Sequence, residues 1–248
     1  MNERDYHDHH YEVDAARIQG SPLFRRVHQR GARQFLRRTG AGRAHRVLSL
    51  GCGDGSIERH LAPHVAEIVG LDLSPVAIAQ ARAQAEAAGL RNVTFAVSAA
   101  GTPLESFGRF DFVAAFAVLH HLNDAQIGDT LRAARTVLHS GGAFYSSDPS
   151  RRRLVRYFAG LVRGTYERYH SPDERELDPA ALAALAAAAG FLQPVISYTD
   201  YFLGPLAWLA PRTPDWLAAA LEAMDSFALG VPLLRRRSEE HTSELQSH

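Results

Sequence analysis

Lysine is absent from this chain of 248 residues, and cysteine occurs once, as Cys52. A single cysteine excludes an intrachain disulfide and the zinc centres that need several thiolates, and it favours a reducing, cytoplasmic compartment. Arginine supplies all 27 fixed cations, and 27 carboxylates balance them, so the chain has no net charge to attract a polyanion. We therefore expect no nucleic-acid partner.

Long apolar runs are lacking too. The alanine-rich run at 180–189 stops at Gly190 and is shorter than the roughly 20 residues of a membrane-spanning helix. The first residues, MNERDYHDHHYE, contain no apolar signal core. Their histidines (His7, His9 and His10) match no closed zinc spacing, so we expect no metal site. Tyr6 and Tyr11 are instead candidates for a lid over a ligand.

What the chain has is an alternation of short apolar runs with helical segments. The pattern predicts strands at 46–50, 67–72, 93–97, 110–116 and 143–147. Helices are expected between them, beginning near 56, 74 and 123 and ending near 62, 89 and 141–142. Parallel neighbouring strands need a crossover between them, so this order predicts an α/β fold with a doubly wound, mostly parallel sheet.

The segments on both sides of this core are expected to be mainly helical. Ser21-Pro22 has the pattern of a helix start, and the helix should run to Gly40. A basic helix at 151–163, a helix from Asp178-Pro179 to Gly190, a strand near 193–198 and a helical stretch at 201–234 follow. We divide the chain into a lead-in and lid (1–44), a main domain (45–200, with an insertion at about 149–178), a helical segment (201–236) and a tail (237–248).

The main chemical signal is the glycine-rich turn in VLSLGCGDGS, residues 47–56. Gly51, Gly53 and Gly55 come directly after the first predicted strand and open a helix. Glycine suits such a site because the turn is tight and a ligand has to approach the backbone. Alone, the trio is weak evidence, since any strand-to-helix turn can use it.

Asp72 strengthens this signal. It ends the second predicted strand, about 20 residues beyond the turn, where a carboxylate can accept hydrogen bonds from both hydroxyls of a ribose. The alternative is a structural turn in which Asp72 only precedes the helix at Ser74. Glycine turn and acid together indicate a nucleoside cofactor.

Two residues of the turn bear on which nucleoside binds. A dinucleotide fingerprint needs a glycine at position 56, where this chain has Ser56. Asp54 lies within the turn, where its charge opposes a pyrophosphate and tolerates a cationic sulfonium. An NAD-dependent oxidoreductase is therefore the disfavoured alternative.

Four segments in order, VLSLGCGDGS, GLDLSP, FDFVAAFAVLHHL and LRAARTVLHSGG, resemble the successive motifs of the class I methyltransferases that use S-adenosylmethionine (SAM), in particular the type 11 and type 25 groups. The resemblance covers residues 45–148. It implies a Rossmann-like fold and SAM as cofactor. It further implies that the turn (Gly51, Cys52, Gly53 and Gly55) lines the site, that Asp72 holds the ribose, that Leu73 packs on the adenine and that Phe116 lies under the cofactor.

One position departs from the family pattern. The family carries an acid soon after the third strand, near the adenine amino group, and this chain has Ala99 there. We expect Ser98, or the backbone of Ala99 and Ala100, to make that contact.

His120 is the candidate catalytic residue. His120 and His121 follow the fourth predicted strand, at the edge of the sheet where ligands bind in such folds. An imidazole there can take a proton from an acceptor hydroxyl, although methyl transfer can also proceed by alignment alone. The alternative is a structural pair. Asp148-Pro149, which ends the fifth strand, either contacts substrate or caps the next helix.

The methyl acceptor is not specified by these motifs, which concern the cofactor. We expect a small molecule, and a lipophilic one if Trp208 and Trp216 line its pocket. The same tryptophans would otherwise touch a membrane surface or pack in the core. A SAM-binding regulator without turnover is the non-enzymatic alternative.

The tail differs from the rest of the chain. RSEEHTSELQSH, from residue 237, resembles the translated read-through of a short-read sequencing adapter and is poor in apolar residues. Methyltransferases of this class end in an antiparallel strand inserted between strands five and six. Nothing between residues 208 and 234 has the pattern of that strand, so we expect the sheet to lack it by truncation and residues 238–248 to be unpacked.

Overall fold

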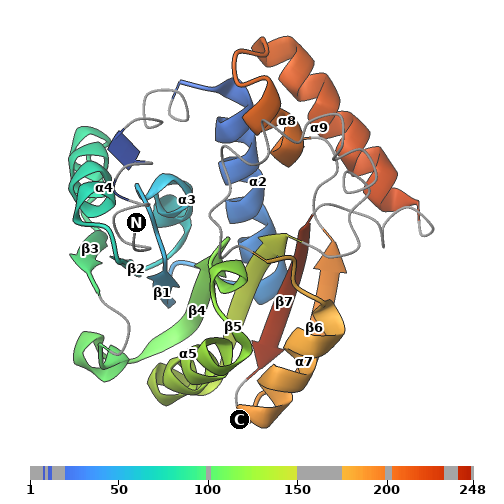
Figure 1. The fold of residues 1–248 in the computed structure, drawn as a ribbon. Helices are drawn as coiled ribbons and strands as arrows, with labels where there is room; N and C mark the ends of the chain where they lie inside the picture. The colour runs from blue at the N-terminus through green and yellow to red at the C-terminus, as the bar shows by residue number, and fades with distance from the viewer. Residues whose placement is uncertain are drawn as a thin grey trace.

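The computed structural model describes residues 8, 11–12, 20–98, 102–149, 175–198, 203–231 and 240–246. A seven-stranded sheet in the order β3-β2-β1-β4-β5-β7-β6 forms its centre (Figure 1). The strands are β1 (Arg46–Leu50), β2 (Glu67–Asp72), β3 (Val93–Val97), β4 (Phe110–Phe116), β5 (Leu138–Pro149), β6 (Leu192–Tyr198) and β7 (Glu240–Gln246). Strands β1 to β5 pair in parallel, as predicted.

The helices begin where the sequence indicates. They are α2 (Pro22–Thr39), α3 (Ser56–Leu61), α4 (Pro75–Ala87), α5 (Asp124–Val137), α7 (Pro179–Ala188), α8 (Leu203–Leu209) and α9 (Asp215–Gly230), with short 3₁₀ turns at Ala62–His64, Leu104–Phe107 and Leu119–His121. The side chains of four N-caps accept a hydrogen bond from the first turn: Ser21, Ser74, Asn123 and Asp178. Each satisfies a backbone N–H that the helix leaves without a partner.

The predicted end of α5 at Gly141-Gly142 is wrong. The helix ends at Val137, and Leu138 already has extended backbone and pairs with Phe110 of β4. Leu138 is buried, so its place in the sheet ends the helix before the glycines are reached.

Alternate residues along the central strands serve two cores, because successive side chains of a strand point to opposite faces. Val47 and Ile68 pack under α2 and α3, whereas their neighbours Leu48 and Val69 pack under α5 and α7. Phe35 of α2 anchors the first face, with its ring edge-on to three sheet aromatics (Phe112, Phe116 and Tyr145). Helices therefore cover both faces, as the doubly wound pattern requires.

The prediction that the sheet lacks its last strand is wrong. Residues 240–246 form β7, which pairs antiparallel with β5 on one side and β6 on the other. Leu245 is fully buried in the core beneath α7. The prediction relied on the adapter-like, polar sequence of the tail and on the lack of a strand pattern before it. A strand between two others is held by backbone hydrogen bonds, which a polar sequence also makes.

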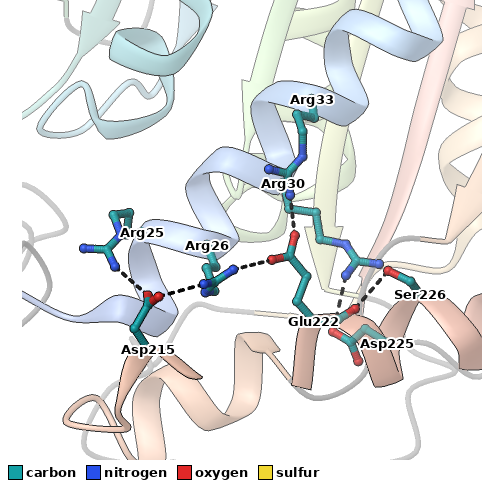
Figure 2. A network of polar contacts seen from close by, with 8 residues as sticks. All are labelled: Arg25, Arg26, Arg30, Arg33, Asp215, Glu222, Asp225 and Ser226. Carbon is teal, nitrogen blue, oxygen red and sulfur yellow. Dashed lines mark hydrogen bonds and ion pairs between the residues drawn. The ribbon is translucent and has the colours of Figure 1, made fainter. Parts of the chain in front are cut away.

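Helices α8 and α9 form a cap above the carboxyl ends of the strands, and they pack on the first turns of α2, whose remainder lies along the sheet (Figure 1). Figure 2 shows four arginines of α2 (Arg25, Arg26, Arg30 and Arg33) facing three acids of α9 (Asp215, Glu222 and Asp225). Arg26 joins two of these acids, with its guanidinium nitrogens 3.0 Å from Asp215 and 2.9 Å from Glu222. A separate apolar cluster, which includes Leu23, Leu203 and Ala218, packs the three helices together.

The predicted basic helix at 151–163 and most of the insertion lie outside the described residues. Within the described part of the chain, no helix is long and apolar enough to cross a membrane.

Candidate functional site

The glycine turn connects β1 to α3, and its three glycines serve different purposes. All have positive φ angles: 62° at Gly51, 54° at Gly53 and 71° at Gly55. A Cβ at Gly51 would collide with Val118, and one at Gly55 would lie 2.7 Å from the Phe95 ring, so both are needed for packing inside the protein.

Gly53 differs, because the group against it comes from the N-terminal segment. A Cβ there would collide with the hydroxyl of Tyr11. Tyr11 is in turn held from α4, since Gln80 donates a hydrogen bond of 2.9 Å to its carbonyl oxygen. Asp8 accepts a hydrogen bond from the Ser74 hydroxyl nearby. Tyr11, which was predicted to form part of a lid, thus lies against the turn.

Asp72 binds the turn directly. One carboxylate oxygen accepts a hydrogen bond of 2.8 Å from the Gly53 amide, and the other accepts one of 2.9 Å from the Ser74 amide. Ser98 donates its amide to the Asp72 carbonyl at 2.8 Å and so lies at the same edge. The predicted pairing of glycine turn and acid is thus present as a hydrogen-bonded unit. The alternative role of Asp72, holding the start of α4, is fulfilled by the same carboxylate.

A cavity of about 250 Å³ opens beside this unit. The predicted residues Gly51, Cys52, Gly53 and Phe116 line it, whereas Gly55, Asp72, Leu73 and Ser98 do not. Ala99 and Ala100 lie outside the described residues. No pattern in the sequence indicated that α2 and α8 form part of this wall, with Phe24, Val27, His28, Arg30 and Gln34 from α2, and Gly204 and Ala207 from α8 beside Trp208.

The charged side chains on the turn side of the cavity are mainly acidic. Asp54 is buried within the turn, with one oxygen accepting the Ser56 amide at 3.1 Å. Burial raises the pKa of the Tyr11 hydroxyl well above its usual value, and Asp72 and Asp54 raise it further. Burial likewise raises the pKa of the Cys52 thiol, so both groups stay protonated near neutral pH. A site with these carboxylates suits a cationic ligand and opposes a pyrophosphate.

His120 is buried and is not among the cavity-lining residues. Asp148 holds it: one carboxylate oxygen accepts the His120 amide at 3.2 Å and lies 3.2 Å from Nδ1 of the ring. Asp148 is itself fully buried at the end of β5, and through the His120 amide it holds the turn after β4. The ring of His121 lies beside that of His120, with centroids 4.1 Å apart and the two planes tilted by 37°.

The two tryptophans have separate environments. Trp208 lines the cavity and meets Phe24 edge-on, with ring centroids 4.8 Å apart. Trp216 of α9 is 72% exposed, so the core-packing interpretation does not apply to it.

The fold and site thus define an α/β protein with a cavity beside a glycine turn and its hydrogen-bonded acid, and comparison with known proteins identifies the family. Residues 47–142 match the family model of a methyltransferase domain. A ubiquinone biosynthesis O-methyltransferase of Azorhizobium caulinodans is 30% identical over 212 residues, covering 80% of this chain and 74% of that protein. One from Methylobacterium sp. is 30% identical over 179 residues, covering 67% of each chain.

Solved structures share the fold. Magnesium protoporphyrin IX methyltransferase of Synechocystis PCC 6803, with bound S-adenosylhomocysteine (SAH), has a TM-score of 0.66 at 17% identity, covering 99% of this chain and 98% of that one. A phosphoethanolamine N-methyltransferase of Haemonchus contortus in complex with SAM has a TM-score of 0.65 at 17% identity, covering all of this chain and 60% of that one.

This chain therefore belongs to the class I SAM-dependent methyltransferases. Its cofactor is SAM, whose sulfonium carries the methyl group that an acceptor atom attacks. The family membership confirms the resemblance seen in the sequence and decides against the NAD-dependent and non-enzymatic alternatives.

Proposed function

We propose that this methyltransferase transfers the methyl group to a hydroxyl oxygen of an apolar small molecule. The observation that carries the proposal is the part of the cavity wall formed by α2 and α8, where Phe24, Val27 and Trp208 present apolar surface. The relatives named as O-methyltransferases of ubiquinone biosynthesis support an oxygen as the attacking atom. A ring-bearing, lipophilic phenol satisfies both.

In this proposal the cofactor occupies the turn side of the cavity. Asp72 accepts the ribose hydroxyls, Leu73 and Ser98 flank the adenine, and Gly51, Cys52 and Gly53 leave space for the rest of the ligand. Phe116 lies beneath it at the end of β4. The observation in favour is that the Asp72 carboxylate is already bonded to the Gly53 amide, so the acid is held in place against a turn that lines the cavity.

The test compares two tryptophans. With labelled SAM and a panel of lipophilic and polar phenols, Trp208→Ala should raise the KM for the acceptor at least tenfold, because a large apolar contact is lost. SAH affinity should stay within a factor of about two, since Trp208 belongs to the α8 part of the wall and not to the turn that holds the cofactor in this proposal. Trp216→Ala is the matched control and should leave both quantities unchanged with a water-soluble acceptor. Labelling on nitrogen or carbon, or equal KM values for the two variants, would contradict the proposal.

His120 is proposed as the general base for that hydroxyl, with Asp148 as the residue that orients its ring. The 3.2 Å contact at Nδ1 supports this, because it leaves Nε2 as the nitrogen that takes the proton. His120→Gln should lower kcat by at least about 10²-fold while SAH binding is retained, as bases supply 10²–10⁴-fold. His121→Gln is the control. If His120→Gln lowers kcat by no more than a factor of about two, His120 has a structural role only.

A lipophilic acceptor would be held in a lipid surface, and the outer face of α9 is a second surface that bears on this. Its most exposed apolar side chains lie within about 100° of one another around the helix and opposite the acids that bind α2; they are Trp216, Leu217, Met224 and Phe227. We propose that this face rests on the lipid surface that holds the acceptor. In a flotation assay, the wild-type protein should float with vesicles of neutral phospholipid, and the double variant Trp216→Ala with Phe227→Ala should not. Failure of the wild type to float would overturn the idea.

A further inference from the structure

Glu58 is a buried carboxylate at the cavity wall that the family motifs do not explain. It lies on α3, in the first turn after the glycines, and is 1% exposed. Its Oε1 accepts a hydrogen bond of 2.6 Å from the hydroxyl of Ser49. Among the residues that the structure describes, its Oε2 has no hydrogen-bond partner. Burying an acceptor without a donor is costly, so this oxygen points to a missing ligand group.

The surroundings of Glu58 set its protonation. The pKa of its carboxyl is raised to about 7, and burial is the main cause. The Ser49 hydrogen bond and Arg59 act in the opposite direction, whereas Asp54 raises the pKa further. The other titratable groups that face it or share its cavity are Cys52 of the turn, Tyr11 of the N-terminal segment, Tyr145 of β5, and His28 and Arg30 of α2. Near neutral pH the protonated and ionised forms of Glu58 thus have similar free energies, and a nearby cation would select the ionised one.

We propose that Oε2 of Glu58 accepts a hydrogen bond from the α-ammonium group of SAM, and that the Glu58 carboxyl releases its proton when the cofactor binds. The ammonium is the fitting partner because it is a cation with N–H donors, whereas the sulfonium has no hydrogen on sulfur to donate. This inference rests on the cofactor of the family and is independent of the acceptor proposed above.

The competing explanation is a structural one, in which Glu58 stays neutral and serves only to bond Ser49. Glutamine at position 58 separates the two, because it has nearly the same shape and can accept the Ser49 hydrogen bond but carries no charge. A purely structural Glu58 predicts that Glu58→Gln binds SAH as the wild type does.

The experiment is calorimetric titration of the full chain with SAH at pH 6 and pH 8, in buffers of different ionisation enthalpy. A carboxyl of pKa about 7 that ionises on binding releases about 0.9 proton at pH 6 and about 0.1 at pH 8, and the affinity rises about tenfold between them. Burial lowers the pKa of His28 to about 4, so it stays neutral over this range. Tyr11 and Cys52, whose pKa values burial raises, stay protonated.

Glu58→Gln should lose the proton release and bind SAH at least tenfold more weakly at pH 8. The matched ligand is 5′-deoxy-5′-methylthioadenosine, which lacks the amino-acid end: wild type and Glu58→Gln should bind it equally. Equal SAH affinities for the two proteins would overturn the proposal. So would the absence of proton release by the wild type at pH 6, which needs no variant to fold. If the wild type binds methylthioadenosine but not SAH, the inference about Glu58 fails while the nucleoside site stands. If the wild type binds neither ligand, both the cofactor site and the proposal are wrong.

Discussion

Tyr11 and Gly53 are in direct contact: the tyrosine hydroxyl occupies the space that a side chain at position 53 would need. This contact joins the N-terminal segment to the cofactor turn, although 42 positions separate the two residues in the chain. It makes Gly53 the one glycine of the turn whose Cβ position is filled from the N-terminal segment, because Val118 and Phe95 occupy that space at Gly51 and Gly55.

Gly53→Ala is expected to lower SAH affinity at least tenfold, since its methyl group enters the cavity and displaces Tyr11. Any L-residue with this φ of 54° also costs about 1 kcal/mol of folding stability. Gly89→Ala is the control, because Gly89 has a φ of 67° and no atom within 4 Å of its Cβ position. It should show the same loss in a denaturant titration with unchanged SAH affinity. Equal affinities for the two variants would remove Gly53 from the site.

Asp72→Asn is expected to weaken SAH binding at least tenfold, because an amide presents one acceptor oxygen where the carboxylate presents two. Asp111→Asn is a matched control: Asp111 also bonds a backbone amide, that of Arg46 at 2.8 Å, but lies at the opposite end of the strands. Calorimetry with SAH distinguishes them. An affinity for Asp72→Asn equal to that of the control would contradict the ribose role.

The cap should depend on one buried ion pair more than on its exposed ones. Asp225 is fully buried, lies 3.7 Å from the Arg30 guanidinium and accepts the Leu203 amide at 3.3 Å. Asp225→Ala should cost about 3–5 kcal/mol, because it leaves a buried cation and an amide without this acceptor. Asp215→Ala, at a side chain 55% exposed, should shift the melting temperature much less. Similar shifts for both would mean that the cap does not close as Figure 2 shows.

Leu245 tests whether the tail belongs in the sheet. Leu245→Ala should cost about 2–5 kcal/mol of unfolding free energy, as a fully buried leucine does, whereas Gln246→Ala on the exposed side should change little. If urea titrations give the same value for both variants, residues 240–246 do not form β7, and the expectation of an unpacked tail is restored.

Glu58 should destabilise the cofactor-free protein at high pH. Its pKa in the folded state, about 7, lies above its ordinary 4.5, so folding favours its protonated form, and that contribution is lost as the pH rises through 7. Relative to Glu58→Gln, the wild type should therefore lose stability between about pH 4.5 and pH 7, by something of the order of 3 kcal/mol. Unfolding free energies of the two proteins at pH 5 and pH 8 measure this difference. A constant difference would show that Glu58 is not desolvated.

Local features of the sequence determined the elements of the main domain. Strands β1 to β4 lie where short apolar runs predicted them, and the caps at Ser21, Ser74 and Asn123 start their helices as expected, because these signals depend on residues a few positions apart. The glycine turn and Asp72 were recognisable for a related reason: parallel strands that neighbour one another end at the same edge, so their ends meet.

Only the tertiary structure decided what surrounds that edge. The α2 stripe containing Phe24 and Val27 was visible in the sequence, but a stripe does not show whether it covers a core or a cavity. The partners of Arg30 and Glu58 come from α9 and β1, and no spacing rule relates those positions. The polar segment 240–246 became the strand between β5 and β6 because its backbone can pair on both sides. Composition and periodicity reflect side chains that are close together in the sequence. Cavity walls, buried charges and inserted strands depend instead on which distant segments fold together.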